Sequence, residues 1–255
     1  MNILCIETST NCCSAAICKD GVAVVSKENL TGANHASELP VFIEELLSQA
    51  RENAWTIDAV ALSEGPGSYT GLRIGASTAK GICYALQIPL LPIDTLQLLC
   101  VAAEASADIP ADALLCPMLD ARRMEVYTAS YMPRECKRIK EVEALVVDEH
   151  SFEAELMEQP VFFFGNGAEK CKAVLTHSNA HFVDGIVPQA KYMGVLAEKQ
   201  DKVLDCKQVA YYEPFYLKVF VPAPSHCIFL RLVVCQLLHL LLFSPILKAV
   251  FSPCL

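Results

Sequence analysis

The chain has 255 residues, of which 53% are hydrophobic, and its formal net charge is −9 at pH 7. The length allows one large domain or two smaller lobes, and the apolar content is sufficient for a buried core. Without the two basic residues of 219–255, Arg231 and Lys248, residues 1–218 carry −11, and so acidic a body is a poor nucleic-acid binder because affinity for phosphates needs clustered Lys and Arg.

The chain begins with three predicted short strands, at residues 3–7, 14–18 and 22–26. Asp20-Gly21 between the second and third is a hairpin signal. The polar run Glu7-Thr8-Ser9-Thr10 follows the first strand. Two interpretations stay open: Glu7 faces a ligand or metal at this turn, or the hydroxyls only satisfy backbone groups of the turn.

A first amphipathic helix is predicted over residues 36–51, because apolar residues recur there at helical spacing. Ser37 is its expected N-cap, and Pro40 is expected in its first turn.

The stretch from Glu64 to Gly75 is glycine-rich and lies between a predicted buried strand (59–63) and a predicted helix (72–86). Ser68 or Thr70 can cap that helix. The turn is either required for packing alone or a backbone cradle for a phosphate at a helix N-terminus. Arg73 favours a nearby anion, because a cation in the first turn opposes the helix macrodipole.

Small residues recur every four positions along the same predicted helix, at Gly71, Gly75 and Ala79. Gly75 and Gly81 each cost about 1 kcal/mol relative to alanine inside a helix. This cost indicates close packing, either within the fold or against a partner.

The second half begins after a boundary at residues 107–111. A strand hairpin of residues 114–120 and 125–131 is predicted there, with Asp120, Arg122 and Arg123 in its turn. This turn is either ion-paired or faces a ligand. Further predicted elements are a helix at 96–105 capped by Asp94-Thr95, a helix start at 151–154 capped by Ser151, a strand at 161–164, and helices at 168–175 and 191–198.

Two features stand apart from this pattern. His177 and His181 are four residues apart, a metal-ligand spacing on a helix, but their surroundings favour a loop or strand edge. Residues 219–255 are apolar and free of Asp, Glu and Gly. They are interpreted as the product of an altered reading frame, as an amphipathic helix, or as a poor membrane anchor; no membrane association is expected, because the stretch 227–243 is short and holds polar residues.

The thirteen cysteines are scattered, without a Cys-x-x-Cys pair. Free buried thiols in a reducing compartment are the favoured interpretation. No secretory leader is expected before the first strand, so a cytoplasmic location is predicted.

The stretch from Gly65 to Gly75 resembles the motif of the TsaB (YeaZ-type) family, subunits of the bacterial machinery that makes threonylcarbamoyladenosine in tRNA. The resemblance covers about residues 1–218, through supporting segments at 3–9, 35–40, 120–127, 165–167 and 214–218. It implies an α/β fold of the two-lobed actin-like/Hsp70/sugar-kinase (ASKHA) type. The expected division is an N-terminal lobe (1–108), a second lobe (109–190), a returning helix and closing segment (191–218), and the apolar tail (219–255).

The resemblance further implies a non-catalytic subunit that pairs with a TsaD-type catalytic subunit and a TsaE-type ATPase, and meets tRNA only through that complex. Alone, the chain is expected to form a homodimer or stay monomeric. The alternatives are a stand-alone ATP-dependent phosphotransferase or ATPase, with Glu7 and Asp120 as acids, and a glycoprotease-like metallopeptidase. The catalytic relatives carry His-x-x-x-His where this chain has His35 and Leu39, so one metal ligand is missing.

The implied sites are of two kinds, with no catalytic or metal residue and no intrinsic cofactor. The implied partner contacts are His35, Glu38, Leu39, Ile43, Leu46, Thr70, Gly71, Ile74, Gly75, Thr78, Ala79 and Ile82. ATP or ADP at the partner interface would contact Glu7, Ser9, Ser68, Thr70 and Arg73.

Overall fold

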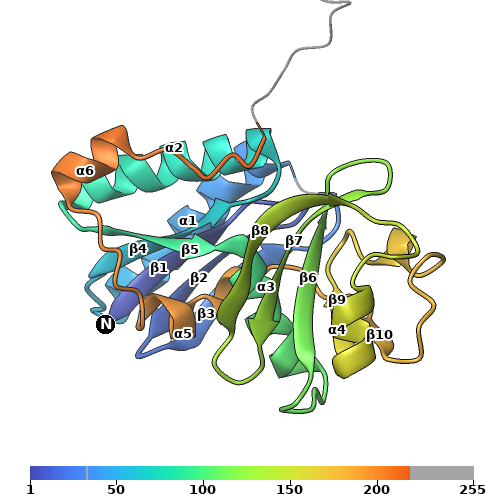
Figure 1. The fold of residues 1–255 in the computed structure, drawn as a ribbon. Helices are drawn as coiled ribbons and strands as arrows, with labels where there is room; N and C mark the ends of the chain where they lie inside the picture. Colours follow the sequence, from blue (N-terminus) through green and yellow to red (C-terminus); the bar gives the residue numbers. More distant parts are fainter. Residues whose placement is uncertain (33, 219–255) are drawn as a thin grey trace, which may run out of the picture. The chain divides into compact units, whose positions relative to one another are not determined.

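The computed structural model describes residues 1–32 and 34–218 (Figure 1). Residues 1–217 form one compact unit. It contains two five-stranded sheets, one in each of the two predicted lobes. The three interpretations of residues 219–255 lie outside the described residues.

The first sheet has the order β3-β2-β1-β4-β5. Its strands are β1 (Asn2–Glu7), β2 (Cys13–Lys19), β3 (Val22–Asn29), β4 (Ala59–Gly65) and β5 (Leu90–Asp94). The first three form an antiparallel meander, and β4 and β5 continue the sheet parallel to β1. One face packs against α1 (His35–Glu52) and α2 (Tyr69–Leu86), whose apolar residues meet those of β1, β2 and β4.

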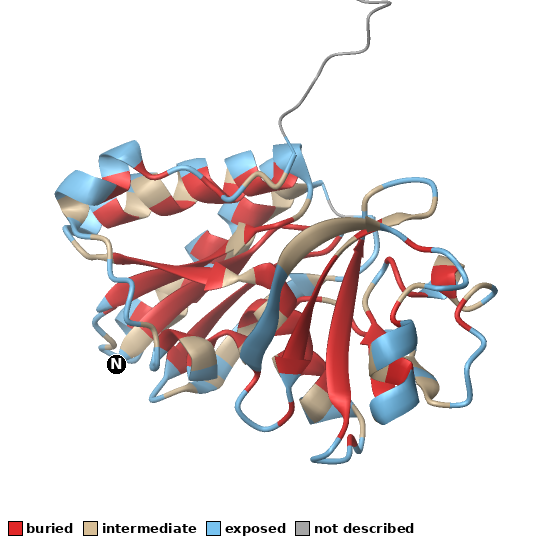
Figure 2. Ribbon diagram, viewed as in Figure 1, coloured by how far each residue is buried: buried red, intermediate tan, exposed pale blue. Residues whose placement is uncertain are grey.

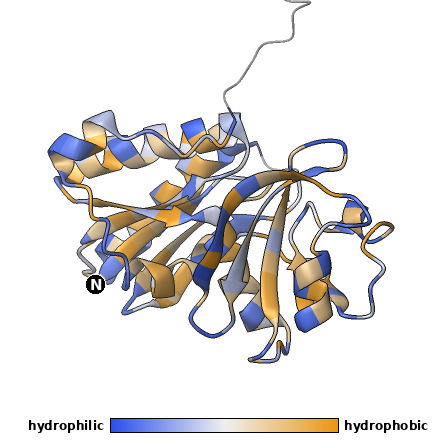
Figure 3. Ribbon diagram, viewed as in Figure 1, coloured by the Kyte–Doolittle hydropathy of each residue, from blue (hydrophilic) through white to orange (hydrophobic). Residues whose placement is uncertain are grey.

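The second sheet has the order β10-β9-β6-β7-β8. Its strands are β6 (Leu114–Asp120), β7 (Glu125–Met132), β8 (Lys137–Val146), β9 (Val161–Phe164) and β10 (Ala180–Val183). The central strands of both sheets are buried (Figure 2). Many of their residues are hydrophobic (Figure 3). Two mixed sheets flanked by helices confirm the predicted α/β class.

The helix α3 (Thr95–Ser106) connects the two sheets and packs in the core of the second. Asp94 caps it as predicted, accepting hydrogen bonds from the backbone N–H of Leu96 and Gln97. The same carboxylate accepts a hydrogen bond from the Tyr131 hydroxyl at 2.7 Å and pairs with Arg138 at 3.2 Å. One side chain of the first sheet thus joins two strands of the second.

The first helix is found within one residue of its predicted bounds, but its predicted N-cap is wrong. Asn34 is the N-cap of α1, and the helix begins at His35. The hydroxyl of Ser37 lies inside the first turn and donates to the Asn34 carbonyl. Pro40 is therefore inside the helix rather than in its first turn. Asn34 makes no side-chain capping bond, so this helix start lacks the interaction that a cap residue normally signals.

The short elements of the second half also differ from prediction. The helix predicted at 168–175 is only the 3-10 turn η1 (Glu169–Cys171), and the one at 191–198 is η2 (Ala190–Tyr192) followed by α5 (Gly194–Ala197). Phe152, not Ser151, is the N-cap of α4 (Glu153–Glu158). The strands β8 and β10 and the helix α6 (Cys206–Tyr211) were not predicted.

The described cysteines are all free, and all except the half-buried Cys206 are buried. Within residues 1–32 and 34–218, no helix combines the length and the hydropathy that crossing a bilayer demands.

Candidate interaction groove

The glycine-rich turn joins β4 to α2 and is covered by the turn between β1 and β2. Ser68 is the N-cap of α2, as predicted, and its hydroxyl accepts the Gly71 N–H at 3.3 Å. The Ser68 N–H donates to the Ser9 carbonyl at 2.6 Å. A Cβ on Gly67 would collide with the same carbonyl. Two backbone donors at this helix start, the N–H groups of Ser68 and Gly71, are thus bound within the chain itself.

Glu7 is fully buried beneath this turn. Its carboxylate accepts hydrogen bonds from the Ser9 N–H and hydroxyl, both at 2.5 Å, and from the Ser63 hydroxyl. Burial raises the pKa of the Glu7 carboxyl, against the opposing effect of these hydrogen bonds. The Thr8 hydroxyl donates to the Gly71 carbonyl at 2.8 Å. The contacts agree with hydroxyls that satisfy the turn, and ligand contact through Glu7 and Ser9 stays a prediction.

The stripe of small residues on α2 faces the chain's own interior. A Cβ on Gly71 would meet the Thr8 carbonyl, and one on Gly75 would meet the Thr8 hydroxyl and, at 3.1 Å, Leu62. This stripe therefore serves close packing within the fold rather than packing against a partner.

Half of the twelve predicted partner contacts are buried in this structure. Six residues of that set lie in the chain's own core, where no partner reaches them: Leu39, Ile43, Leu46, Gly71, Gly75 and Ala79.

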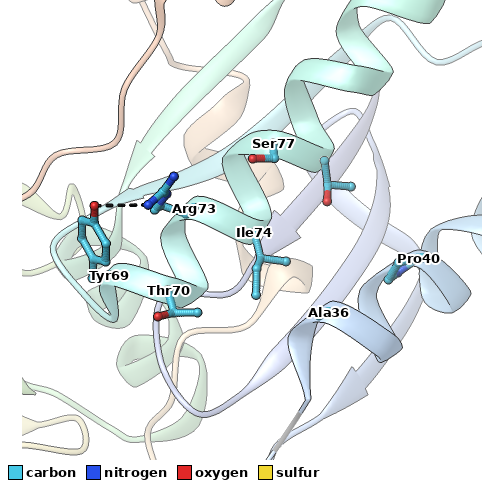
Figure 4. A pocket seen from close by; sticks show the side chains of 8 residues that line it. Ala36, Pro40, Tyr69, Thr70, Arg73, Ile74 and Ser77 are labelled. Atoms are coloured by element: carbon cyan, nitrogen blue, oxygen red, sulfur yellow. Dashed lines mark hydrogen bonds between the residues drawn. The ribbon is translucent and has the colours of Figure 1, made fainter. Parts of the chain in front are cut away.

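The remaining predicted contacts lie at or near the surface around a groove between α1 and α2. The groove has a volume of about 460 Å³, with Thr70, Ile74 and Thr78 of α2 on one side and Ala36 and Pro40 of α1 on the other (Figure 4). Ile82 lies one turn beyond Thr78 on the same helix and packs partly against the core.

His35 and Glu38 are anchored at the start of α1. The imidazole Nε2 of His35 lies 3.0 Å from the Cys12 carbonyl, and the Glu38 carboxylate accepts the Asn29 amide at 3.1 Å. These contacts hold the N-terminus of α1 against the first sheet.

Arg73 is exposed at the edge of the groove and lies over the Tyr69 ring, 5.5 Å from its centroid. It donates to the Tyr69 hydroxyl at 3.4 Å (Figure 4). The Tyr69 ring in turn packs on Tyr216 at 4.9 Å. The predicted nucleotide set therefore divides: Glu7, Ser9 and Ser68 gather at the closed turn, whereas Thr70 and Arg73 face the open groove.

The outer side of α2 carries a second series of small residues that sequence reasoning missed. Ser77, Gly81 and Ala85 recur every four positions and are exposed. A Cβ on Gly81 would meet no atom within 4 Å. Glycine lowers helix stability relative to alanine at both positions. At Gly75 close packing requires the glycine, whereas at Gly81 no described residue lies close enough to require it.

The predicted sites at Asp120 and at His181 make contacts with neighbouring residues. Asp120 pairs with Lys170, not with either neighbouring arginine, and accepts the Arg122 N–H at 3.2 Å. His181 lies on the edge strand β10, and its ring stacks on Phe162 at 5.0 Å. Within the part of the chain that the structure describes, no three His, Cys, Asp or Glu side chains gather as metal ligands would.

Comparison with known proteins gives the same family as the motifs. The family model "TsaD: tRNA N6-adenosine threonylcarbamoyltransferase" matches residues 29–218. The chain is 28% identical over 181 residues to "tRNA threonylcarbamoyladenosine biosynthesis protein TsaB" of Bacillus subtilis, covering 69% of this chain and 75% of that protein. It is 34% identical over 131 residues to the Escherichia coli protein of the same name, covering 51% of this chain and 55% of that one.

A solved structure extends the similarity to the fold. The "crystal structure of an uncharacterized protein with similarity to peptidase YEAZ from Pseudomonas aeruginosa" superposes with a TM-score of 0.72 at 25% identity, covering 85% of this chain and 99% of that one. The alignment with the Escherichia coli relative spans only about half its length, 55%. Since the family model matches residues 29–218, the greater part of the sequence, the chain belongs to the TsaD family, and within it to the TsaB (YeaZ-type) proteins.

Proposed function

We propose that this chain serves tRNA threonylcarbamoyladenosine biosynthesis as a non-catalytic subunit that binds and activates a TsaD-type catalytic subunit. The contact surface is the α1–α2 groove together with the exposed series Ser77, Gly81 and Ala85. A TsaE-type ATPase completes the assembly, and the chain alone uses the same surface for a homodimer.

The observation that carries this proposal is the open space beside Gly81. A glycine inside an exposed helix weakens that helix by about 1 kcal/mol relative to alanine. Within the described chain, nothing approaches the glycine closely enough to require it. A helix of a second protein, packed across α2 at a small-residue crossing, would use this space.

Nucleotide at this interface is part of the same proposal. Of the five predicted nucleotide contacts, Thr70 and Arg73 line the groove. ATP or ADP bound between the subunits would meet the Thr70 hydroxyl and the Arg73 guanidinium, and Arg73 would leave the Tyr69 hydroxyl to pair with phosphate oxygens.

A stand-alone phosphotransferase or ATPase is less well supported. It would need two accessible acids to hold magnesium and activate a nucleophile. Glu7 is buried and bound to Ser9 and Ser63, and Asp120 is paired with Lys170.

Size-exclusion chromatography with light scattering tests the assembly. The chain is measured alone and mixed with the TsaD-type subunit of the same organism, in ADP and in ATP. A new one-to-one species is the expected result. Failure to associate in both nucleotides would remove the basis of the proposal.

A matched pair of variants locates the contact. Ala36→Arg places a long cation in the groove, and we expect it to weaken association at least about tenfold, equivalent to about 1.4 kcal/mol. Ala105→Arg makes the same change at an exposed position near the end of α3 and should leave association intact. Equal effects of the two variants would place the contact elsewhere.

A further inference from the structure

Pro40 lies inside α1, at a point where the backbone hydrogen bonds of the helix have already begun. The helix starts at His35, and the N–H of Glu38 donates to the Asn34 carbonyl at 3.0 Å. Continuing this pattern requires an N–H at position 40 that donates to the Ala36 carbonyl. Proline has no N–H, so this hydrogen bond is missing. The helix therefore leaves one backbone acceptor, the Ala36 carbonyl, without its usual donor.

The residues on both sides of this missing hydrogen bond belong to the α1–α2 groove. Ala36 and Pro40 are exposed, and both line the groove from the α1 side. Ile74 lies opposite them on α2 (Figure 4). An interior proline also weakens a helix, so Pro40, like Gly81 on α2, makes the isolated chain less stable than it could be.

Covering the groove turns this carbonyl into a constraint on the partner. In the free chain, water can reach the groove, whereas a subunit packed over α1 and α2 excludes water from it. A backbone carbonyl that is buried without a donor opposes association. A partner with a purely apolar contact side would leave the Ala36 carbonyl in that state. A partner that fits the groove therefore brings a hydrogen-bond donor to this carbonyl.

The other groups of the groove favour an uncharged donor. The Arg73 guanidinium lines the same groove and would repel a second cation, and the residues that line the groove include no Asp or Glu to offset that repulsion. Thr70, Ser77 and Thr78 add hydroxyls that can donate or accept. The amide of an Asn or Gln side chain suits this set, because its nitrogen donates to the carbonyl and its oxygen accepts from a hydroxyl.

We propose that the TsaD-type subunit inserts an amide side chain, Asn or Gln, into the groove and that this amide donates a hydrogen bond to the Ala36 carbonyl. Pro40 is then a specificity determinant, because it withholds the helix's own donor and keeps the carbonyl available to the partner. The inference rests on the proposed function, since it names the group with which that subunit occupies the same site.

The test measures association of the full chain with the TsaD-type subunit by titration calorimetry, in ADP and without nucleotide. Pro40→Ala restores the N–H that binds the Ala36 carbonyl within α1. We expect association to weaken about tenfold, because the partner's amide then lacks its acceptor. Pro40→Val restores the same N–H but keeps an apolar side chain of similar bulk, and it should weaken association equally. The isolated Pro40→Ala chain should melt at a higher temperature, because an interior proline is removed.

Pro110→Ala is the control, because Pro110 is also exposed but lies between α3 and β6. It should associate within about twofold of the unmodified chain. Pro40 variants that associate like this control overturn the inference and leave the proposed function standing.

Two further outcomes also overturn the inference alone. Weakening by Pro40→Ala without weakening by Pro40→Val would mean that apolar bulk, not the carbonyl, makes the contact. A loss seen only in ADP would mean that the carbonyl serves the nucleotide. If the unmodified chain does not associate at all, the proposed function and this inference fall together.

Discussion

Glu7 illustrates how one buried side chain stabilises the turn that a ligand was expected to fill. Its carboxylate accepts hydrogen bonds from Ser9 and Ser63, and no part of it reaches solvent. Burial disfavours the charged form more than these hydrogen bonds favour it, so the pKa of Glu7 is raised. The turn therefore holds a carboxyl group that folding makes harder to ionise.

The pH dependence of stability follows from this raised pKa. Because the folded pKa of Glu7 lies above its unfolded value, its favourable contribution is full below the unfolded pKa and is lost as pH rises through the folded value. We expect the stability of the unmodified chain relative to Glu7→Gln to fall as pH rises above the unfolded pKa of about 4.3 and through the raised folded pKa. The total loss is about 1.4 kcal/mol for each pH unit that separates the two pKa values. Urea unfolding at several pH values measures it.

The exposed Glu44→Gln on α1 is the control for losing a carboxylate. A relative stability of Glu7→Gln that does not change with pH, or changes in the opposite direction, would contradict burial as the dominant cause.

At the scale of the element, two of the three glycines of α2 have opposite roles. Gly75 is buried against Thr8 and Leu62, whereas the space beside Gly81 is empty. We expect Gly75→Ala to lower the free energy of unfolding by about 1–3 kcal/mol, because the added methyl group overpacks the core. Gly81→Ala should raise it by up to about 1 kcal/mol through helix propensity alone.

Chemical unfolding of the two variants measures both effects, and changes of the same sign would be inconsistent with this assignment. Gly81→Ala also separates stability from assembly: the same methyl group that stabilises the isolated chain would intrude where a partner helix is proposed to cross.

Long amphipathic elements were predictable from the sequence, and short exposed ones were not. The helices α1, α2 and α3 have clear apolar periodicity and were found close to their predicted bounds. The strand β8 was missed because it is a charged edge strand with most residues exposed. The helix predicted at 168–175 failed because tertiary contacts, not local propensity, decide so short a segment.

The sequence could not predict which face of α2 points into the core. Gly71, Gly75 and Ala79 recur every four residues, and so do Thr70, Ile74 and Thr78, offset by about 100° around the helix. Spacing alone does not reveal which series faces inward. The contacts of Thr8 with Gly71 and Gly75 show that the glycine series faces inward. Thr8 precedes Gly71 by 63 residues, so local spacing along α2 cannot reveal this contact.

At the scale of the whole molecule, Asp94 joins the two sheets. Its carboxylate caps α3 and bonds Tyr131 and Arg138 of the second sheet. Since residues 1–217 form one compact unit, both sheets are expected to unfold in a single transition.

Calorimetry on two capping variants tests the role of this link. Asp205 is also an N-cap that accepts two backbone N–H groups, but its carboxylate makes no bond to the second sheet among the described residues. Asp205→Ala should cost about 1 kcal/mol. Asp94→Ala should cost about 2–4 kcal/mol, because the buried Tyr131 hydroxyl also loses its partner. Equal losses would mean that the link between the sheets contributes little.

The buried cysteines have a consequence for how the protein ages. A thiol reacts with oxidants as the exposed thiolate, and burial both hides these sulfur atoms and, for Cys13, Cys83 and Cys116, raises the pKa to about 12. Folding thereby protects the buried thiols of the described residues against sulfenic acid formation and mixed disulfides. Oxidation of these buried thiols would be confined to the moments when the chain is newly made or transiently unfolded, so thermodynamic stability and the chemical lifetime of these side chains are linked.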